Sequence, residues 1–178
     1  ETADTVFVGT TNKIPLKIAK DQKVKALRAF YAELKKAMID LAKKIVLDGE
    51  GAKKFIEIRV TNSKTATRAK KICFSIANSL LVKTAIAWED ANWGRIIMAI
   101  GKTKINLKIE NIKIYIQSFL LCENGKAINS IDDTKLSRAL KRDTVNIKVD
   151  LGEGGRTFTV WTSDLTEDYV RINADYRS

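Results

Sequence analysis

The longest periodic pattern in the sequence is helical and extends from Asp21 to about Val46. Its apolar side chains recur every three or four residues, which is the spacing of one face of an α-helix. Asp21 is suited to cap the first turn, and a turn-forming run at 48–51 ends the helix. We expect this face to be buried, and its apolar residues are Val24, Leu27, Phe30, Leu34, Met38, Leu41 and Ile45.

Strand patterns surround a second helical pattern in the rest of the first half. Residues 3–10 alternate like a strand, and 54–62 and the mostly apolar run 80–87 are also typical of strands, the last of a central one. Residues 64–78 have helical spacing, and Ser63 can cap that helix.

The second half is dominated by strands. Residues 106–128 predict strands with a hairpin turn at Asn124-Gly125, because Asn-Gly favours the tight turns of hairpins. Residues 132–140 predict a short helix, and 144–165 predict a hairpin whose turn is the glycine-rich run 152–155. That run lacks the Gly-Lys-Ser/Thr of a phosphate-binding loop. Residues 166–176 predict a final helix of one or two turns.

These patterns indicate an α+β fold in which helices pack on a mixed or antiparallel sheet. We expect a helix and strand lobe at 1–101 and a strand-rich lobe at 102–178, packed as one unit. No apolar run has the length of a membrane span, and no signal peptide opens the sequence. Cys73 and Cys122 lie in apolar segments, which favours buried thiols over a disulfide.

The composition excludes several kinds of site. The chain has no His, which removes Ser-His-Asp catalysis and any His-bound metal. A nucleophile that uses its own α-amine as base would need no His, but residue 1 is Glu1. The net charge of +11 leaves nucleic-acid binding as an alternative. Against it, the lysines are scattered and stacking aromatic residues are few.

Two segments carry candidate chemistry. Residues 88–95 combine two Trp, Glu89, Asp90, Asn92 and Arg95. Adjacent carboxylates face opposite ways in an extended segment, and Asn92 is suited to cap a short helix over 95–100, so a structural corner is favoured. Arg95 could pair with either carboxylate or bind a substrate carboxylate.

Glu50 lies between two glycines, and two interpretations of it remain open. In the first it is a solvated loop residue. In the second it binds an ammonium group, with the glycines allowing a substrate to come close.

The segment "SLLVKTAIAWEDANWGRIIMAIG" (79–101) resembles a stretch of the ornithine acetyltransferase family, also called glutamate N-acetyltransferase, of arginine biosynthesis. "VDLGEGG" (149–155) and "TVWTSDLTEDYVRINADY" (159–176) resemble the C-terminal end of that family. "ADTVFVG" (3–9) and "DGEGAKKFIEI" (48–58) resemble earlier parts of it in the same order. Trp88 departs from the pattern, since the family usually has Gly there.

The resemblance implies an N-terminal-nucleophile-like enzyme. Family members cut themselves before a Thr, which becomes the nucleophile of the β chain. That Thr takes an acetyl group from N-acetylornithine and passes it to glutamate in a ping-pong reaction. No metal or cofactor is implied, although acetyl-CoA is a possible co-substrate. The implied partner is the α chain of the same precursor, in a cytoplasmic dimer of αβ pairs without nucleic acid or membrane.

The resemblance also assigns residues. Glu50, Asn173 and Ser178 match family positions that contact the amino-acid substrate. The nucleophilic Thr would fall upstream of Glu1, so no catalytic residue is expected in this chain, and we expect the chain alone to be inactive. A related N-terminal-nucleophile aminopeptidase is the alternative within the superfamily, and a non-catalytic basic nucleic-acid-binding domain is the alternative outside it.

Overall fold

The computed structural model describes residues 25–175 together with residues 7, 9, 11 and 13. Most of the strand expected at 3–10 therefore lies outside the described residues, as do Asp21 and Ser178. Contacts divide the chain into one unit that ends at Asp40 and a second unit from Leu41 to Ser178. The helix α1 (Lys25–Leu47) begins in the first unit and ends in the second.

Helix α1 confirms the long helical pattern, but the burial expected of its apolar face is wrong. Phe30, Met38, Leu41 and Ile45 are all exposed, and only Leu34 of the described face residues is half-buried. The spacing of apolar residues shows where they gather on a helix. It does not show whether another part of the chain packs against them.

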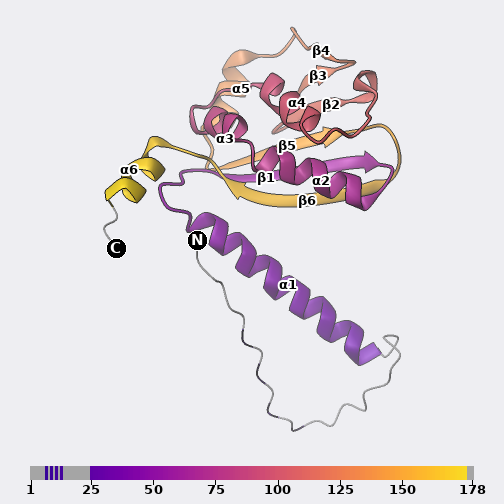
Figure 1. Cartoon of the computed structure of the whole chain (residues 1–178), viewed down its shortest axis with the longest axis vertical. Helices are drawn as coiled ribbons and strands as arrows, with labels where there is room; N and C mark the ends of the chain where they lie inside the picture. The colour runs from indigo at the N-terminus through magenta and orange to yellow at the C-terminus, as the bar shows by residue number, and fades with distance from the viewer. Residues whose placement is uncertain (1–6, 8, 10, 12, 14–24, 176–178) are drawn as a thin grey trace. The chain divides into compact units, whose positions relative to one another are not determined.

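A six-stranded sheet forms the centre of the second unit (Figure 1). Its order is β4-β3-β2-β5-β1-β6. The pair β1 and β5 is parallel and all other neighbours are antiparallel, so the sheet is mixed and the α+β prediction is confirmed. The strands are β1 (Phe55–Ser63), β2 (Lys113–Ile116), β3 (Phe119–Glu123), β4 (Lys126–Ala127), β5 (Thr144–Asp150) and β6 (Arg156–Ser163).

The hairpin expected over 144–165 is wrong, because β1 lies between β5 and β6. The glycine-rich run instead crosses the end of β1. The backbone N–H groups of Glu153 and Gly154 both donate to the Asn62 carbonyl at 2.8 Å. A Cβ at Gly154 would lie 2.7 Å from the Ser63 carbonyl oxygen, so glycine permits this close crossing. The strand β1, from the lobe expected at 1–101, therefore shares one sheet with the strands of the lobe expected at 102–178.

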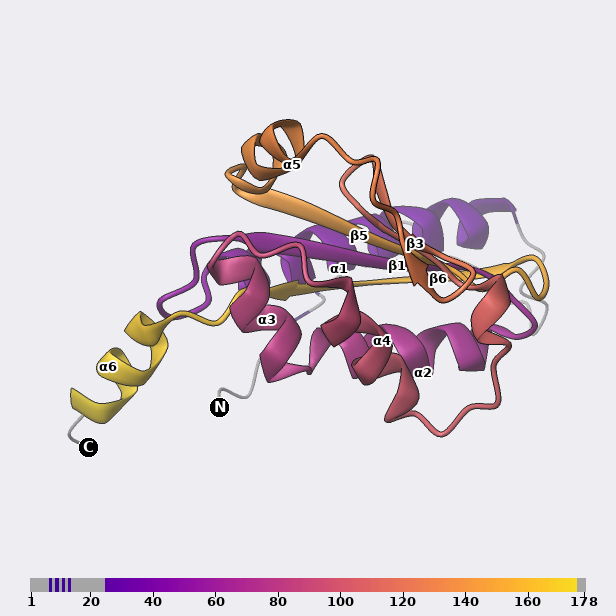
Figure 2. The ribbon, with the colours of Figure 1, turned by 90° about the horizontal axis from the view of Figure 1, so that it is seen from above.

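Three helices cover one face of the sheet: α2 (Ala66–Ala77), α3 (Leu80–Ala87) and α4 (Trp93–Gly101) (Figure 2). The strand expected at 80–87 is therefore wrong. A short apolar run does not by itself separate a strand from a buried helix. Here the Ser79 hydroxyl caps α3 by accepting from the Val82 N–H at 3.4 Å. Thr65, rather than Ser63, caps α2.

The remaining elements agree with the sequence except at 106–112, where a strand was expected and the chain forms loop and a short 3₁₀ turn instead. Asp132 caps α5 (Asp133–Leu140), and a short 3₁₀ turn, η1 (Ile109–Asn111), precedes β2. Asn124 and Gly125 both have positive φ, of 54° and 71°, so the predicted Asn-Gly turn between β3 and β4 is confirmed. The predicted final helix is α6 (Glu167–Asp175).

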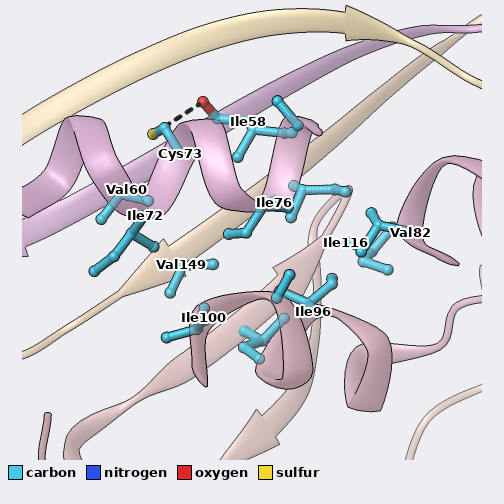
Figure 3. Packing of buried hydrophobic residues seen from close by; sticks show 14 of the residues in the cluster. Ile58, Val60, Ile72, Cys73, Ile76, Val82, Ile96, Ile100, Ile116 and Val149 are labelled. Atoms are coloured by element: carbon cyan, nitrogen blue, oxygen red, sulfur yellow. Dashed lines mark hydrogen bonds between the residues drawn. The ribbon is translucent and has the colours of Figure 1, made fainter. Parts of the chain in front are cut away.

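The core lies between the sheet and the three helices (Figure 3). Ile56, Ile58 and Val60 alternate along β1 and are fully buried. The thiol of Cys73 on α2 donates to the Ile58 carbonyl at 3.7 Å, and burial raises its pKa to about 12. Cys122 is also free and buried, which confirms the expectation for both thiols. None of the helices in the described part of the chain is both long and apolar enough to cross a membrane.

The central position of β1 leads to a stability prediction. Ile58→Ala removes a fully buried side chain and should lower the free energy of unfolding by about 2–5 kcal/mol in urea denaturation. Arg59→Ala, on the exposed face of the same strand, is the control and should change it by less than about 0.5 kcal/mol. Equal losses in the two variants would contradict the packing described.

Candidate functional site

The antiparallel pairing of β1 with β6 brings two distant segments together. Phe55 at the start of β1 lies opposite Ser163 at the end of β6. The loop 48–54 that precedes β1 and the helix α6 that follows β6 therefore leave the sheet at the same edge (Figure 1). Any site that combines them is set by this register.

Asp164, directly after β6, fastens the loop to that edge. Its Oδ1 accepts from the backbone N–H groups of Lys53 and Lys54 at 2.9 and 3.0 Å, and its own N–H donates to the Lys54 carbonyl at 3.1 Å. The residue is only 3% exposed. A buried carboxylate that accepts backbone N–H groups is a strong anchor, since removing it would leave those donors unpaired.

Gly51 allows α6 to pack directly on the loop. Its φ is +68°, and an added Cβ would lie 2.6 Å from the backbone nitrogen of Tyr169. The Thr166 hydroxyl donates to the Gly51 carbonyl at 2.6 Å, and the Lys53 ammonium pairs with Asp168 at 2.9 Å. Only glycine fits this conformation and contact without strain.

This packing places Glu50 beside Asn173. The Asn173 Nδ2 donates to Glu50 Oε2 at 2.9 Å and to the Tyr169 carbonyl at 2.9 Å. Both side chains are exposed. The structure thus joins two of the three residues singled out from the sequence, while Ser178 lies outside the described residues.

The geometry defines what these two side chains can bind. Both N–H groups of the Asn173 amide are used, so its oxygen is the group left to interact, and it is an acceptor. The Glu50 carboxylate likewise offers only acceptors when ionised. Two neighbouring acceptors, one of them charged, suit an ammonium group. In this arrangement the Asn173 amide has no N–H group left for a substrate carboxylate.

The segment 88–95 is a corner between two helices, as the sequence favoured. Glu89 has a positive φ of 58°, and its carboxylate binds the Lys54 ammonium at 3.3 Å. Asp90 instead accepts from the Asn92 side chain at 3.2 Å, and Asn92 caps α4 by accepting from the Arg95 N–H at 3.2 Å. The two carboxylates therefore serve separate structural contacts.

Arg95 forms an ion pair with neither Glu89 nor Asp90. Its guanidinium donates to the Leu81 carbonyl at 2.9 Å and to the Thr84 hydroxyl at 3.3 Å, both on α3. It thus ties α4 to α3. Trp88 finds room by lying at the surface, where it is 75% exposed and borders a small hollow of about 120 Å³ together with Lys53.

Asp164 and Lys83 are residues near the site that the sequence patterns did not reveal. Burial lowers the pKa of Lys83, and the negative charge of Asp164 partly offsets this effect. The signal for Lys83 was a single charge inside the apolar run 80–87, and nothing marked Asp164 as buried. In residues 25–175 and the few others described, no cluster of His, Cys, Asp or Glu is suited to hold a metal.

The fold resembles that of a solved protein. A crystal structure titled as the arginine biosynthesis bifunctional protein argJ from Bacillus halodurans matches with a TM-score of 0.82 and 40% identity. The match covers 88% of this chain and 73% of that one. This places the chain in the structural class of the argJ-type α+β proteins.

The sequence comparisons agree. The ArgJ family pattern matches residues 1–178. The arginine biosynthesis bifunctional protein ArgJ of Mesorhizobium japonicum is 43% identical over 99% of this chain, and that of Agrobacterium fabrum is 40% identical over 99%. The chain belongs to the ArgJ family. It spans 44% of the length of each of these two relatives.

Replacing Gly51 should separate α6 from the loop. Gly51→Ala adds a Cβ that meets backbone at 2.6 Å in a left-handed conformation, so we expect a loss of at least ~1 kcal/mol in stability. Amide hydrogen exchange of α6 should become faster. Gly101→Ala is the control, because a Cβ there has open space. Unchanged exchange in α6 would show that the close contact does not hold the helix.

The Lys53–Asp168 pair should make α6 sensitive to acid. The hydrogen bond from Lys53 lowers the pKa of Asp168 below its ordinary 3.8, with a smaller contribution from Arg171. A lowered pKa means that the stabilisation is complete above that ordinary value and is lost as the pH falls through the lowered one. Asp168 in turn raises the pKa of Lys53, so the pair persists at alkaline pH.

We therefore expect hydrogen exchange in α6, corrected for intrinsic rates, to accelerate below about pH 4. The Asp168→Asn variant should lack this transition and exchange faster at neutral pH. An acid transition of the same size in that variant would show that a group other than Asp168 causes the transition.

Proposed function

We propose that this chain forms the amino-acid-binding part of an ornithine/glutamate acetyltransferase of arginine biosynthesis. The observation that carries the proposal is the pairing of Glu50 with Asn173 at 2.9 Å, which leaves acceptors suited to an ammonium group. Membership of a family whose relatives are named for arginine biosynthesis supports it.

The proposed donor substrate, N-acetylornithine, fits these acceptors. Its α-amine is acetylated and uncharged, so its side-chain ammonium is its one positive group. Glu50 and the Asn173 oxygen would hold that ammonium, and Ser178 would contact the same substrate. Because the ammonium takes no part in the bond changes, the contact would position the acetylated end for reaction.

The proposed reaction has two steps and uses a Thr that these 178 residues do not supply. The Thr oxygen attacks the acetyl carbonyl, the amide C–N bond breaks, and ornithine leaves with a proton on its nitrogen. The amine of glutamate then attacks the acetyl ester, and the Thr hydroxyl is restored. No metal or cofactor enters these steps. Acetyl-CoA would serve as a second acetyl donor.

The proposed assembly is a cytoplasmic dimer of pairs, each formed by an α chain and a β chain of one precursor. The α chain would supply the groups that stabilise the charged tetrahedral intermediate. In this arrangement the chain described here is inactive by itself, and its part is to shape the substrate pocket.

Glu50→Gln in the complete protein that carries this chain tests the proposal. The variant keeps the shape of Glu50 and an acceptor for Asn173 but removes the charge. We expect kcat/KM for N-acetylornithine to fall roughly 10- to 100-fold, since hydrogen bonds to charged groups are worth about 1.5–3 kcal/mol. Glu110→Gln, at an exposed site on η1, is the matched control and should behave like the unaltered protein.

The outcomes distinguish the alternatives. Unchanged kinetics for N-acetylornithine in Glu50→Gln would remove Glu50 from the site. Hydrolysis of peptides by the unaltered protein, without acetyl transfer, would instead assign the aminopeptidase activity of a related N-terminal-nucleophile enzyme.

A further inference from the structure

Basic side chains surround an open hollow at the end of the sheet where β1 and β5 begin. The hollow has a volume of about 420 Å³ and is bounded by α5, the start of β5 and the turn between β2 and β3. Three cations line it: Lys135, Arg138 and Arg142. Its volume lies in the range of small-molecule sites, roughly 300–1,000 Å³.

Hydrogen bonds fix the floor of this hollow. Gln117, in the β2–β3 turn, has a positive φ of 54°, and its Nε2 donates to the carbonyls of Ala139 and Thr144 at 3.2 and 2.8 Å. Its Oε1 accepts from the Asn146 side chain at 3.1 Å. One amide thus joins the turn, the end of α5 and the start of β5. The backbone that carries the two arginines is therefore held in place.

The arginines are available to a ligand. Within the part of the chain that the structure describes, Arg138 and Arg142 form no ion pair, although Asp143 is adjacent in sequence. Lys135 is bound to Asp132 at 3.1 Å and contributes its charge less freely. Both arginines are exposed. A guanidinium is a planar fork that matches two phosphate oxygens, and two such forks suit a ligand with more than one phosphate oxygen exposed.

We propose that this hollow binds a phosphate-bearing small molecule, with Arg138 and Arg142 holding its phosphate oxygens. Ser118 also lines the hollow, and its hydroxyl is a further donor for the same group. The net charge of +11 favours the approach of such an anion. The proposal does not depend on acetyl transfer, because it concerns binding and uses none of the residues around Glu50.

Calorimetric titration of the complete protein tests this site. The probes are pyrophosphate, ATP and a short oligonucleotide, each without a divalent metal and at 50 and 150 mM salt. The Arg138→Ala/Arg142→Ala variant should bind pyrophosphate at least about tenfold more weakly, as expected for the loss of charge-assisted hydrogen bonds. The control is Arg59→Ala/Arg156→Ala, which removes the same charge from two exposed positions on β1 and β6 and should keep the unaltered affinity. Circular dichroism checks that both variants are folded.

The result also identifies the kind of ligand. Tighter binding of ATP than of pyrophosphate, lost in the Arg138/Arg142 variant alone, assigns a nucleotide, and equal binding of the two assigns the phosphate group itself. No binding of either pyrophosphate or ATP by the unaltered protein overturns the proposal. Equal weakening in both double variants also overturns it, as does salt-sensitive binding of a short oligonucleotide alone, which would indicate a dispersed surface for nucleic acid.

Discussion

The pairing of β1 with β6 is the constraint on which the candidate site depends. Because the two strands are antiparallel, the chain enters β1 and leaves β6 at one edge of the sheet. The segments that carry Glu50 and Asn173 are 123 positions apart in sequence, yet both are fixed at that edge. A shift of the register by one residue would turn every side chain of β6 to the opposite face and displace α6.

Two contacts convert this shared edge into a defined arrangement. Asp164 holds the loop by two backbone N–H groups, and Gly51 removes the side chain that would keep α6 away. The hydrogen bonds of Asp164 are buried, and the packing at Gly51 depends on the absence of a side chain. Salt therefore weakens neither contact much. Glu50 and Asn173 themselves are exposed, which leaves them free to exchange their mutual hydrogen bond for one to a ligand.

Local chemistry made much of the fold predictable from the sequence. The Asn124-Gly125 turn, the cap at Asn92, the short helix over 132–140 and the strand pattern of β1 each depend on a few neighbouring residues. The errors arose where distant parts of the chain decide. The apolar run 80–87 is a helix because it packs on other helices, and β5 and β6 are separated because β1 pairs with both. No local pattern contains that information.

The candidate site was predictable in part. Glu50 and Asn173 were identified by resemblance to a family, and their contact agrees with a shared location. The orientation of the Asn173 amide depends on the carbonyl of Tyr169 and so could not be read from the sequence. Asp164 was missed because an Asp after a strand is normally a solvated turn residue, and only the fold buries it.

A crystal structure of the complete protein with bound N-acetylornithine would test the central claim most directly. The account predicts that the ligand's ammonium nitrogen lies within about 3 Å of a Glu50 carboxylate oxygen, with the Asn173 oxygen as a second acceptor. A ligand bound elsewhere, with Glu50 and Asn173 still bonded only to each other, would contradict it.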